Sequence, residues 1–202
     1  MGCGKSSVGR ELSQLLCCPF MDLDQVIEER EGRSIPEIFG SEGEEVFRSM
    51  ELGTLKEIVG LPMYSRGPLP LRGPLPLAGG GKMPLPYNRQ TAKRPHNTIQ
   101  SRETASLVLA LGGGAVMRAE CAEIVHSDTL CIYLRASIET LMEHLSGQTG
   151  SRPLLDSSSL KERIETLMTQ RSATYEKTAH IIIDTDGKSV EAVASEIISK
   201  LG

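Results

Sequence analysis

Short apolar runs alternate along this chain with longer segments in which apolar residues recur every three or four positions. Residues 106–111, 129–134 and 180–184 are almost continuously apolar, and residues 17–21 form a shorter apolar run. Strands without polar alternation are typical of parallel sheets that helices cover on both faces. The pattern therefore predicts parallel strands at these four places.

Segments with helical spacing of apolar residues lie between these runs. The predicted helices are residues 5–16, 24–31, 41–59, 137–146, 160–175 and 189–201. Strands that alternate with helices predict an α/β fold. A chain of 202 residues is long enough for one domain with a sizeable core, which must consist mainly of aliphatic residues because aromatic residues are scarce.

One segment, residues 61–100, departs from this pattern. It holds eight of the eleven prolines and repeats the hexapeptide Arg-Gly-Pro-Leu-Pro-Leu at residues 66–71 and 72–77. Proline removes a backbone donor and fixes φ, so it is excluded from helix interiors and central strands. We therefore expect a single domain over residues 1–202 that carries a Pro/Gly-rich low-complexity insertion at residues 61–100.

Composition and charge exclude several classes of protein. The net charge of −4 argues against a nucleic-acid-binding protein, which usually carries a basic excess. No apolar run approaches the roughly 18 residues needed to span a membrane. The five cysteines have neither a CxxC pair nor the spacing of a Cys/His metal site, so we expect reduced cysteines in a cytoplasmic protein.

Residues 2–7, Gly-Cys-Gly-Lys-Ser-Ser, open the first predicted helix and match the second half of the phosphate-binding pattern GxxxxGK[ST]. In such a loop, backbone N–H groups and a helix N-terminus face phosphate oxygens. The lysine, here Lys5, reaches the β- and γ-phosphates, and the hydroxyl of Ser6 binds Mg²⁺. The first glycine of the pattern and the strand that normally feeds the loop would precede Met1, so a chance Gly-Lys-Ser remains an alternative.

Two further groups of polar residues suggest a substrate site. Asp22 and Asp24 follow the first apolar run, and alternate carboxylates on an extended segment point the same way. A solvated pair that caps the next helix is the alternative. Arg48 and Glu51 are spaced to pair on a helix, and a guanidinium suits a substrate carboxylate, although an ordinary surface ion pair would have the same spacing.

Three later features complete the candidate site. Glycines 112–114 end an apolar strand, where they allow a ligand to approach the backbone closely. Arg152 lies in a polar stretch that suggests a mobile lid over bound phosphates, or else a plain surface loop. Arg171 lies near the end of a predicted helix, where a cation is also favoured by the helix dipole alone.

Taken in order, the motifs GxGKSS, FxDxD, FRxxE, GGGA, RPLL and RxxxY resemble those of the shikimate kinase family, over the whole chain except residues 61–100. The resemblance implies a three-layer P-loop kinase fold with a parallel sheet, whose first, central strand is missing from this chain. It also implies transfer of the γ-phosphate of ATP to the 3-hydroxyl of shikimate, with Mg²⁺, in a monomer.

The resemblance assigns roles residue by residue. Catalysis is expected of Lys5, Asp24 and Arg152, and metal binding of Ser6 and Asp22. ATP binding is expected of Gly2, Cys3, Gly4, Lys5, Ser6, Ser7 and Arg152. Shikimate binding is expected of Asp24, Arg48, Gly112, Gly113, Gly114 and Arg171. The chain departs from the family in its missing first strand, in its insertion, and in the lack of an arginine at residues 141–147.

Two alternatives remain from the sequence. The chain could be another P-loop kinase, acting on gluconate or a nucleoside monophosphate, although two arginines for a carboxylate favour an acidic ring substrate. It could also be a truncated, non-catalytic protein, in which the proline-rich insertion serves as a docking segment for an SH3- or WW-like groove.

Overall fold

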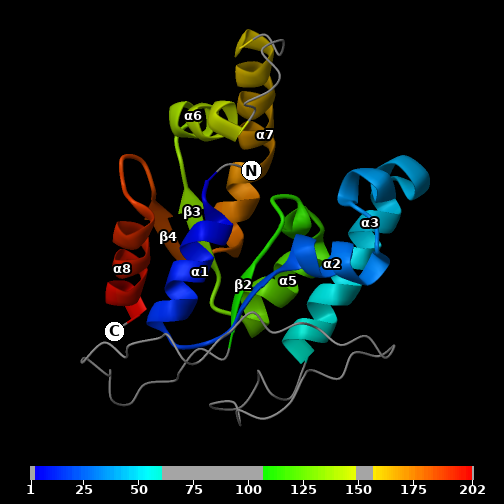
Figure 1. Cartoon of the computed structure of the whole chain (residues 1–202), viewed down its shortest axis with the longest axis horizontal. Helices are drawn as coiled ribbons and strands as arrows, with labels where there is room; N and C mark the ends of the chain where they lie inside the picture. Colours follow the sequence, from blue (N-terminus) through cyan, green and yellow to red (C-terminus); the bar gives the residue numbers. More distant parts are fainter. Residues whose placement is uncertain (1–2, 61–106, 149–156, 202) are drawn as a thin grey trace.

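The computed structural model describes residues 3–60, 107–148 and 157–201 (Figure 1). The predicted insertion at residues 61–100 lies outside these ranges. Within them, four short strands alternate with helices, as the α/β prediction requires. No helix in the described ranges is both long and apolar enough to cross a membrane.

The strands form two parallel pairs. β1 (Phe20–Asp22) pairs with β2 (Val108–Ala110), and β3 (Ile132–Arg135) pairs with β4 (Ile181–Asp184). The parallel arrangement is the predicted one. Each strand has only three or four residues, fewer than the apolar run that predicted it, because the remaining apolar residues lie in the adjoining loops and turns.

The two pairs are not hydrogen-bonded to each other in the part of the chain that the structure describes. The expected P-loop sheet would instead be continuous across this position. The expectation that a central strand is missing from this chain is therefore neither confirmed nor contradicted, and it stays a prediction.

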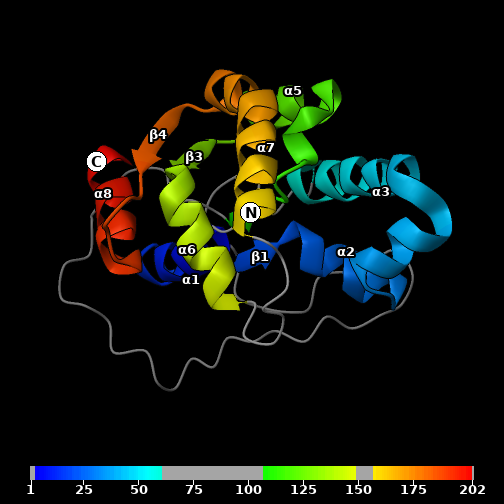
Figure 2. The same cartoon turned by 90° about the horizontal axis from the view of Figure 1, so that it is seen from above.

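Helices cover both pairs. α1 (Lys5–Leu15) packs against α8 (Val190–Leu201) and β2, and α2 (Leu23–Glu31) packs against α3 (Ile35–Gly60). Figures 1 and 2 show α1 and α8 beside the β3–β4 pair, with α2 and α3 at the other end of the molecule. α6 (Ile138–Gln148) packs against α7 (Ser157–Thr178), which in turn contacts the short helix η1 (Ala115–Met117).

The buried core is aliphatic, as the composition predicts. Under α2 and α3 the fully buried side chains include Leu23, Ile27 and Ile38. Between α1, α8 and the β3–β4 pair they include Ile183 and Ile197. The first cluster includes Met21 of β1 and the second includes Val8 of α1. Both elements that lead into the candidate site are therefore anchored in the core.

Three sequence predictions about elements were wrong in detail. β1 begins at Phe20 rather than residue 17, because α1 ends at Leu15 and Cys17 adopts a positive φ of 55° in the turn that follows. α3 begins at Ile35 rather than at residue 41, and the backbone is non-helical at Gly43 (φ 83°, ψ 175°), so the helix is kinked inside the predicted range. α5 (Ala119–Asp128) was missed because only Cys121 and Val125 of its residues are fully buried, which leaves a weak periodicity.

Candidate active site

The phosphate-binding motif forms a turn that leads into a helix. Gly4 is the residue before α1 and has a φ of 73°, a conformation that favours glycine over any residue with a Cβ. Lys5 is the first residue of α1, and its Nζ lies 3.8 Å from the Sγ of Cys3. Ser7 is exposed on the first turn, and Gly2 lies outside the described residues. The α1 N-terminus therefore presents backbone N–H groups beside the lysine, as a phosphate site requires.

Asp22 connects this helix to β1. It is the last residue of β1, and its Oδ2 accepts a hydrogen bond from the hydroxyl of Ser6 at 2.7 Å. Its Oδ1 also accepts a hydrogen bond from the backbone N–H of Asp24 at 3.2 Å and so caps α2. The prediction that both carboxylates lie on one extended segment was wrong, because Asp24 already lies in the first turn of α2. The capping alternative holds for Asp22.

Asp24 is a half-buried carboxylate among several charges. Burial raises its pKa above the ordinary value, and the nearby Asp22 carboxylate raises it further. Lys5 and Arg48 act in the opposite direction, because a positive charge favours the carboxylate form. The structure thus brings the phosphate-loop lysine, the carboxylate and the helix arginine into one electrostatic environment.

Glycines 112–114 follow β2 and lie against this environment. A Cβ added to Gly112 would lie 2.5 Å from the Oδ1 of Asp24 and 3.1 Å from the Oε1 of Glu51. A Cβ added to Gly114 would overlap the guanidinium of Arg48. The absence of side chains at these two positions is what allows the backbone to approach both charged groups.

Arg48 and Glu51 pair on α3 as their spacing predicts. The Nη1 of Arg48 donates to the Oε2 of Glu51 at 2.6 Å, and its Nη2 donates to Glu44 at 2.9 Å. Glu51 is only 1% exposed, and burial raises its pKa, with the hydrogen bond from Arg48 opposing this. An ordinary surface ion pair would not have a buried carboxylate, so this pair holds the guanidinium in place at the glycine loop.

α7 also contacts the glycine loop, residues 112–114. The Nη1 of Arg171 lies 3.4 Å from the carbonyl oxygen of Gly113, and the hydroxyl of Tyr175 donates a hydrogen bond to that same oxygen. A pocket at the carboxyl end of β3 is lined by residues that include Cys3, Arg171 and Tyr175, so α7 also borders the phosphate loop. The RxxxY motif contains Tyr175, but nothing in the sequence pattern indicates a role for its hydroxyl.

The predicted site residues Lys5, Ser6, Asp22, Asp24, Arg48, glycines 112–114 and Arg171 are therefore neighbours at the carboxyl ends of β1 and β2. Arg152 lies outside the described residues, so its predicted place over the phosphates is not tested.

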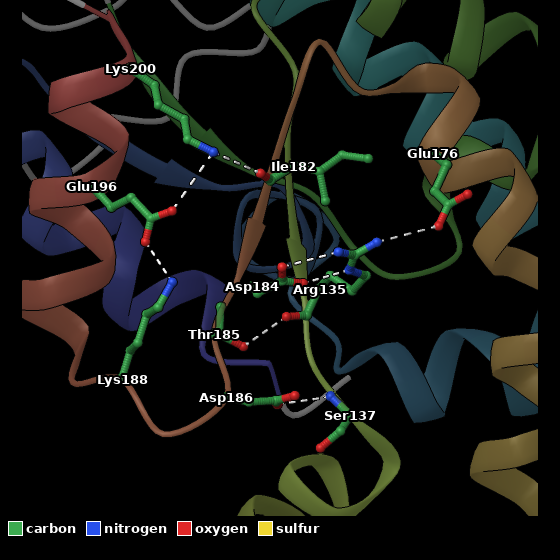
Figure 3. Close-up of polar contacts among 10 residues, drawn as sticks. All are labelled: Arg135, Ser137, Glu176, Ile182, Asp184, Thr185, Asp186, Lys188, Glu196 and Lys200. Carbon is green, nitrogen blue, oxygen red and sulfur yellow. Dashed lines mark hydrogen bonds and ion pairs between the residues drawn. The ribbon is translucent and has the colours of Figure 1, made fainter.

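A second group of polar contacts, shown in Figure 3, fixes the ends of the other strand pair. The guanidinium of Arg135 donates two hydrogen bonds to Asp184, at 2.5 and 3.0 Å, and lies 3.9 Å from Glu176 of α7. Asp186 accepts a hydrogen bond at 2.8 Å from the backbone N–H of Ser137, just before α6. These contacts tie β3 and β4 to α6 and α7, and the sequence offered no signal for them because the partners are far apart in the chain.

A family model described as shikimate kinase matches residues 1–62 and 86–202. The chain belongs to the shikimate kinase family. A shikimate kinase of Thermus thermophilus is 37% identical over 201 residues, covering 100% of this chain and 85% of that protein. The shikimate kinase of Thioalkalivibrio sulfidiphilus is 33% identical, covering 98% of this chain and 80% of that protein.

Solved structures of shikimate kinases agree with this assignment. The shikimate kinase of Acinetobacter baumannii, solved in complex with shikimate, superposes with a TM-score of 0.71 at 27% identity, covering 100% of this chain and 88% of that one. The shikimate kinase of Aquifex aeolicus gives a TM-score of 0.65 at 26% identity, covering 100% of this chain and 90% of that one. The kinase predicted from the motif order is thereby confirmed at the level of the family.

Proposed function

We propose that this chain transfers the γ-phosphate of ATP to the 3-hydroxyl of shikimate, as the family assignment implies. The observation that supports this most directly is the convergence of Asp24 and Arg48 on glycines 112–114, beside Lys5 of the phosphate loop. A carboxylate next to an amine suits a hydroxyl acceptor, and the nearby guanidinium suits the carboxylate of the same acceptor.

Lys5 and the start of α1 would hold the phosphates of ATP. Cys3, Gly4, Ser6 and Ser7 supply the backbone N–H groups at the helix N-terminus, and Gly2 would complete the loop. Lys5 would balance the charge on the transferred phosphoryl group, and Arg152 would add a second positive charge. Phosphoryl transfer requires little covalent help, so this alignment of charges would provide most of the rate enhancement.

Asp24 would bind the acceptor hydroxyl and take its proton. Arg48 and Arg171 approach glycines 112–114 from α3 and α7, so a carboxylate held between them would be gripped from two sides. Backbone N–H groups of the glycine loop would complete the contacts. The acceptor ring would then lie with its hydroxyl toward Lys5, as in-line transfer demands.

The residues present fit a magnesium ion. The hydroxyl of Ser6 and the carboxylate of Asp22 lie 2.7 Å apart, and Mg²⁺ prefers oxygen ligands while retaining several waters. Ser6 and Asp22 would hold the ion, which supplies positive charge beside the phosphates.

At the level of the whole chain, we propose a three-layer fold in which a further strand fits between the β1–β2 and β3–β4 pairs. Each pair is parallel, and Val8 and Leu12 of α1 share one core cluster with residues of β2, β3 and β4, so this helix packs across both pairs. We also propose one domain over residues 1–202 with the insertion at 61–100, acting as a cytoplasmic monomer. Size-exclusion chromatography with light scattering tests the monomer.

The function is tested by ADP release coupled to NADH oxidation, with shikimate, gluconate and nucleoside monophosphates as acceptors. We expect turnover with shikimate alone, and Lys5→Ala should lower kcat by about 10²- to 10⁴-fold. Preference for gluconate or a nucleotide would assign a different P-loop kinase. ATP binding without turnover on any acceptor would instead favour a non-catalytic protein.

A further inference from the structure

Tyr175 contacts the glycine loop at a point where small displacements matter. Its hydroxyl donates a hydrogen bond to the carbonyl oxygen of Gly113, which lies between Gly112, next to Asp24, and Gly114, next to Arg48. The two flanking glycines touch these charged groups so closely that neither position has room for a Cβ. The position of the Gly113 peptide therefore sets the distance from the backbone to the side chains of Asp24 and Arg48.

Tyr175 shares this carbonyl with Arg171, one helical turn earlier on α7. The Nη1 of Arg171 lies 3.4 Å from the carbonyl oxygen, at the outer limit of a hydrogen bond. Tyr175 makes the closer contact, so the carbonyl is satisfied without the guanidinium. The neutral hydroxyl thus makes the closer contact, and the guanidinium of Arg171, held at 3.4 Å, has further donors for an anion.

The ring of Tyr175 is itself held in place. It packs against Tyr133 of β3 with ring centroids 5.2 Å apart, and against the cluster that contains Leu55 of α3 and Val125 of α5. Tyr175 therefore links the half of the molecule that carries Asp24 and Arg48 to the β3–β4 pair. Within the described ranges no strand pairing joins these two halves. Side-chain contacts such as this one therefore hold them together.

We propose that Tyr175 is a positioning residue for shikimate, a role that rests on the proposed function. It fixes the Gly113 peptide and keeps the contact between Arg171 and that peptide long, so that Arg48, Arg171 and the glycine loop meet the substrate carboxylate together. Without the hydroxyl, Arg171 would be the remaining donor to this carbonyl in the described ranges, and a closer contact would draw its guanidinium away from the substrate.

The test compares Tyr175→Phe with Tyr133→Phe, which removes the hydroxyl from the other ring of the same pair. We expect Tyr175→Phe to raise the shikimate KM about five- to tenfold, as loss of one well-placed hydrogen bond does. The ATP KM, kcat and melting temperature should change little, because Phe preserves the ring packing. Tyr133→Phe should leave all four values unchanged.

Two further measurements separate positioning from a general structural effect. In an Arg171→Ala background, Tyr175→Phe should lower shikimate affinity, measured by calorimetry, by clearly less than in the wild-type background, because the part of its effect that passes through Arg171 is already lost. A shikimate analogue with a hydroxymethyl group in place of the carboxylate should bind wild type and Tyr175→Phe equally.

Several results would overturn the proposal. These are an unchanged shikimate KM in Tyr175→Phe, the same loss with and without Arg171, or a parallel loss of ATP binding and melting temperature. If the wild-type chain phosphorylates shikimate but Tyr175→Phe behaves as wild type, only this inference fails. If the wild-type chain does not phosphorylate shikimate, the proposed function fails and the inference with it.

Discussion

Asp24, the proposed general base, lies in a site that is unfavourable for its charge. Burial and the adjacent Asp22 raise its pKa, and the carboxylate is the form that accepts a proton. We therefore expect kcat/KM for shikimate to fall about tenfold per pH unit on acidification, starting at a higher pH than an ordinary aspartate would give. The pH profile between 4 and 8 measures this, with circular dichroism at each pH to show that the protein stays folded. An acid limb at or below the usual aspartate range would contradict it.

Replacement of Asp24 by Asn should lower turnover and raise stability together. Because the pKa of Asp24 is higher in the folded protein than in the unfolded chain, its charged form is disfavoured by folding at neutral pH. Asn removes this charge at nearly constant shape, so the free energy of unfolding at pH 7 should rise while kcat falls about 10²- to 10⁴-fold.

Urea unfolding at pH 7 and at pH 4 measures the stability effect. The gain over wild type should shrink at the lower pH, where the wild-type carboxyl becomes protonated. Equal stability of wild type and Asp24→Asn at both values would mean that Asp24 carries no electrostatic cost.

Gly114 allows the backbone to approach Arg48, so a single methyl group there should disturb substrate binding. In Gly114→Ala the new Cβ overlaps the guanidinium, whose side chain can shift more easily than the backbone. We expect the shikimate KM to rise at least about tenfold, with a small change in melting temperature, because a bidentate contact to a carboxylate depends on the exact place of the guanidinium. Gly53→Ala is the matched control, because a Cβ at that α3 position meets nothing within 4 Å. An unchanged shikimate KM in Gly114→Ala would mean that Arg48 does not bind the substrate.

At the residue scale, the sequence could predict contacts that are local in the chain. Arg48 and Glu51 pair because residues three apart on a helix are neighbours, whatever the rest of the fold does. The hydrogen bond from Tyr175 to Gly113 joins residues 62 positions apart. No spacing rule predicts such a contact, because it depends on how α7 packs against the loop after β2.

Among the elements, α3 contains a bend that a helical pattern does not reveal. Gly43 has φ 83° and ψ 175°, a region that residues with a Cβ adopt only at a cost of about 1–3 kcal/mol. Gly43→Ala should therefore lower the free energy of unfolding by about this amount. Gly40→Ala, three residues earlier with open space around it, should instead be neutral or stabilising by up to about 1 kcal/mol. Urea unfolding of both variants measures the difference, and equal effects would contradict the strained conformation.

The elements that could be predicted are those with strong periodicity and clear ends. α1 and α8 match their predicted ranges within one residue because each has a regular apolar face. α5 was missed because its buried face consists of Cys121 and Val125, and β1 was placed too early because Cys17 and Cys18 are apolar but lie in a turn. Apolar composition alone does not distinguish a strand from the turn before it.

At the scale of the whole molecule, alternation of strands and helices was sufficient to predict a parallel α/β protein. It was not sufficient to predict that the described strands form two separate pairs. Strand pairing depends on which strands come together in space. The local sequence between two strands does not determine this. Part of the candidate site could still be predicted, because Asp22, Asp24 and glycines 112–114 lie at or just after the ends of two parallel strands, whose carboxyl ends lie on the same side.

The connection between α3 and β2 bears on the whole chain, because it joins the two segments that carry Arg48 and glycines 112–114. The shikimate kinase family model leaves residues 63–85 unmatched. Their removal halves the number of residues that connect Gly60 to Leu107, and halving the length of a loop lowers its closure entropy cost by about 0.6 kcal/mol. We therefore expect the deletion variant to keep the wild-type shikimate KM within about twofold and to gain about that free energy of unfolding.

A variant in which a Gly/Ser sequence of equal length replaces residues 63–85 separates length from composition. It should match the wild-type chain in both stability and kinetics, because neither Arg48 nor the glycine loop contacts it in this prediction. Loss of shikimate binding in the deletion alone would mean that the length of the connection holds α3 at its distance from β2. Loss in both variants would mean that the proline-rich sequence itself contributes to the site, and the segment could no longer be treated as an insertion into a shikimate kinase domain.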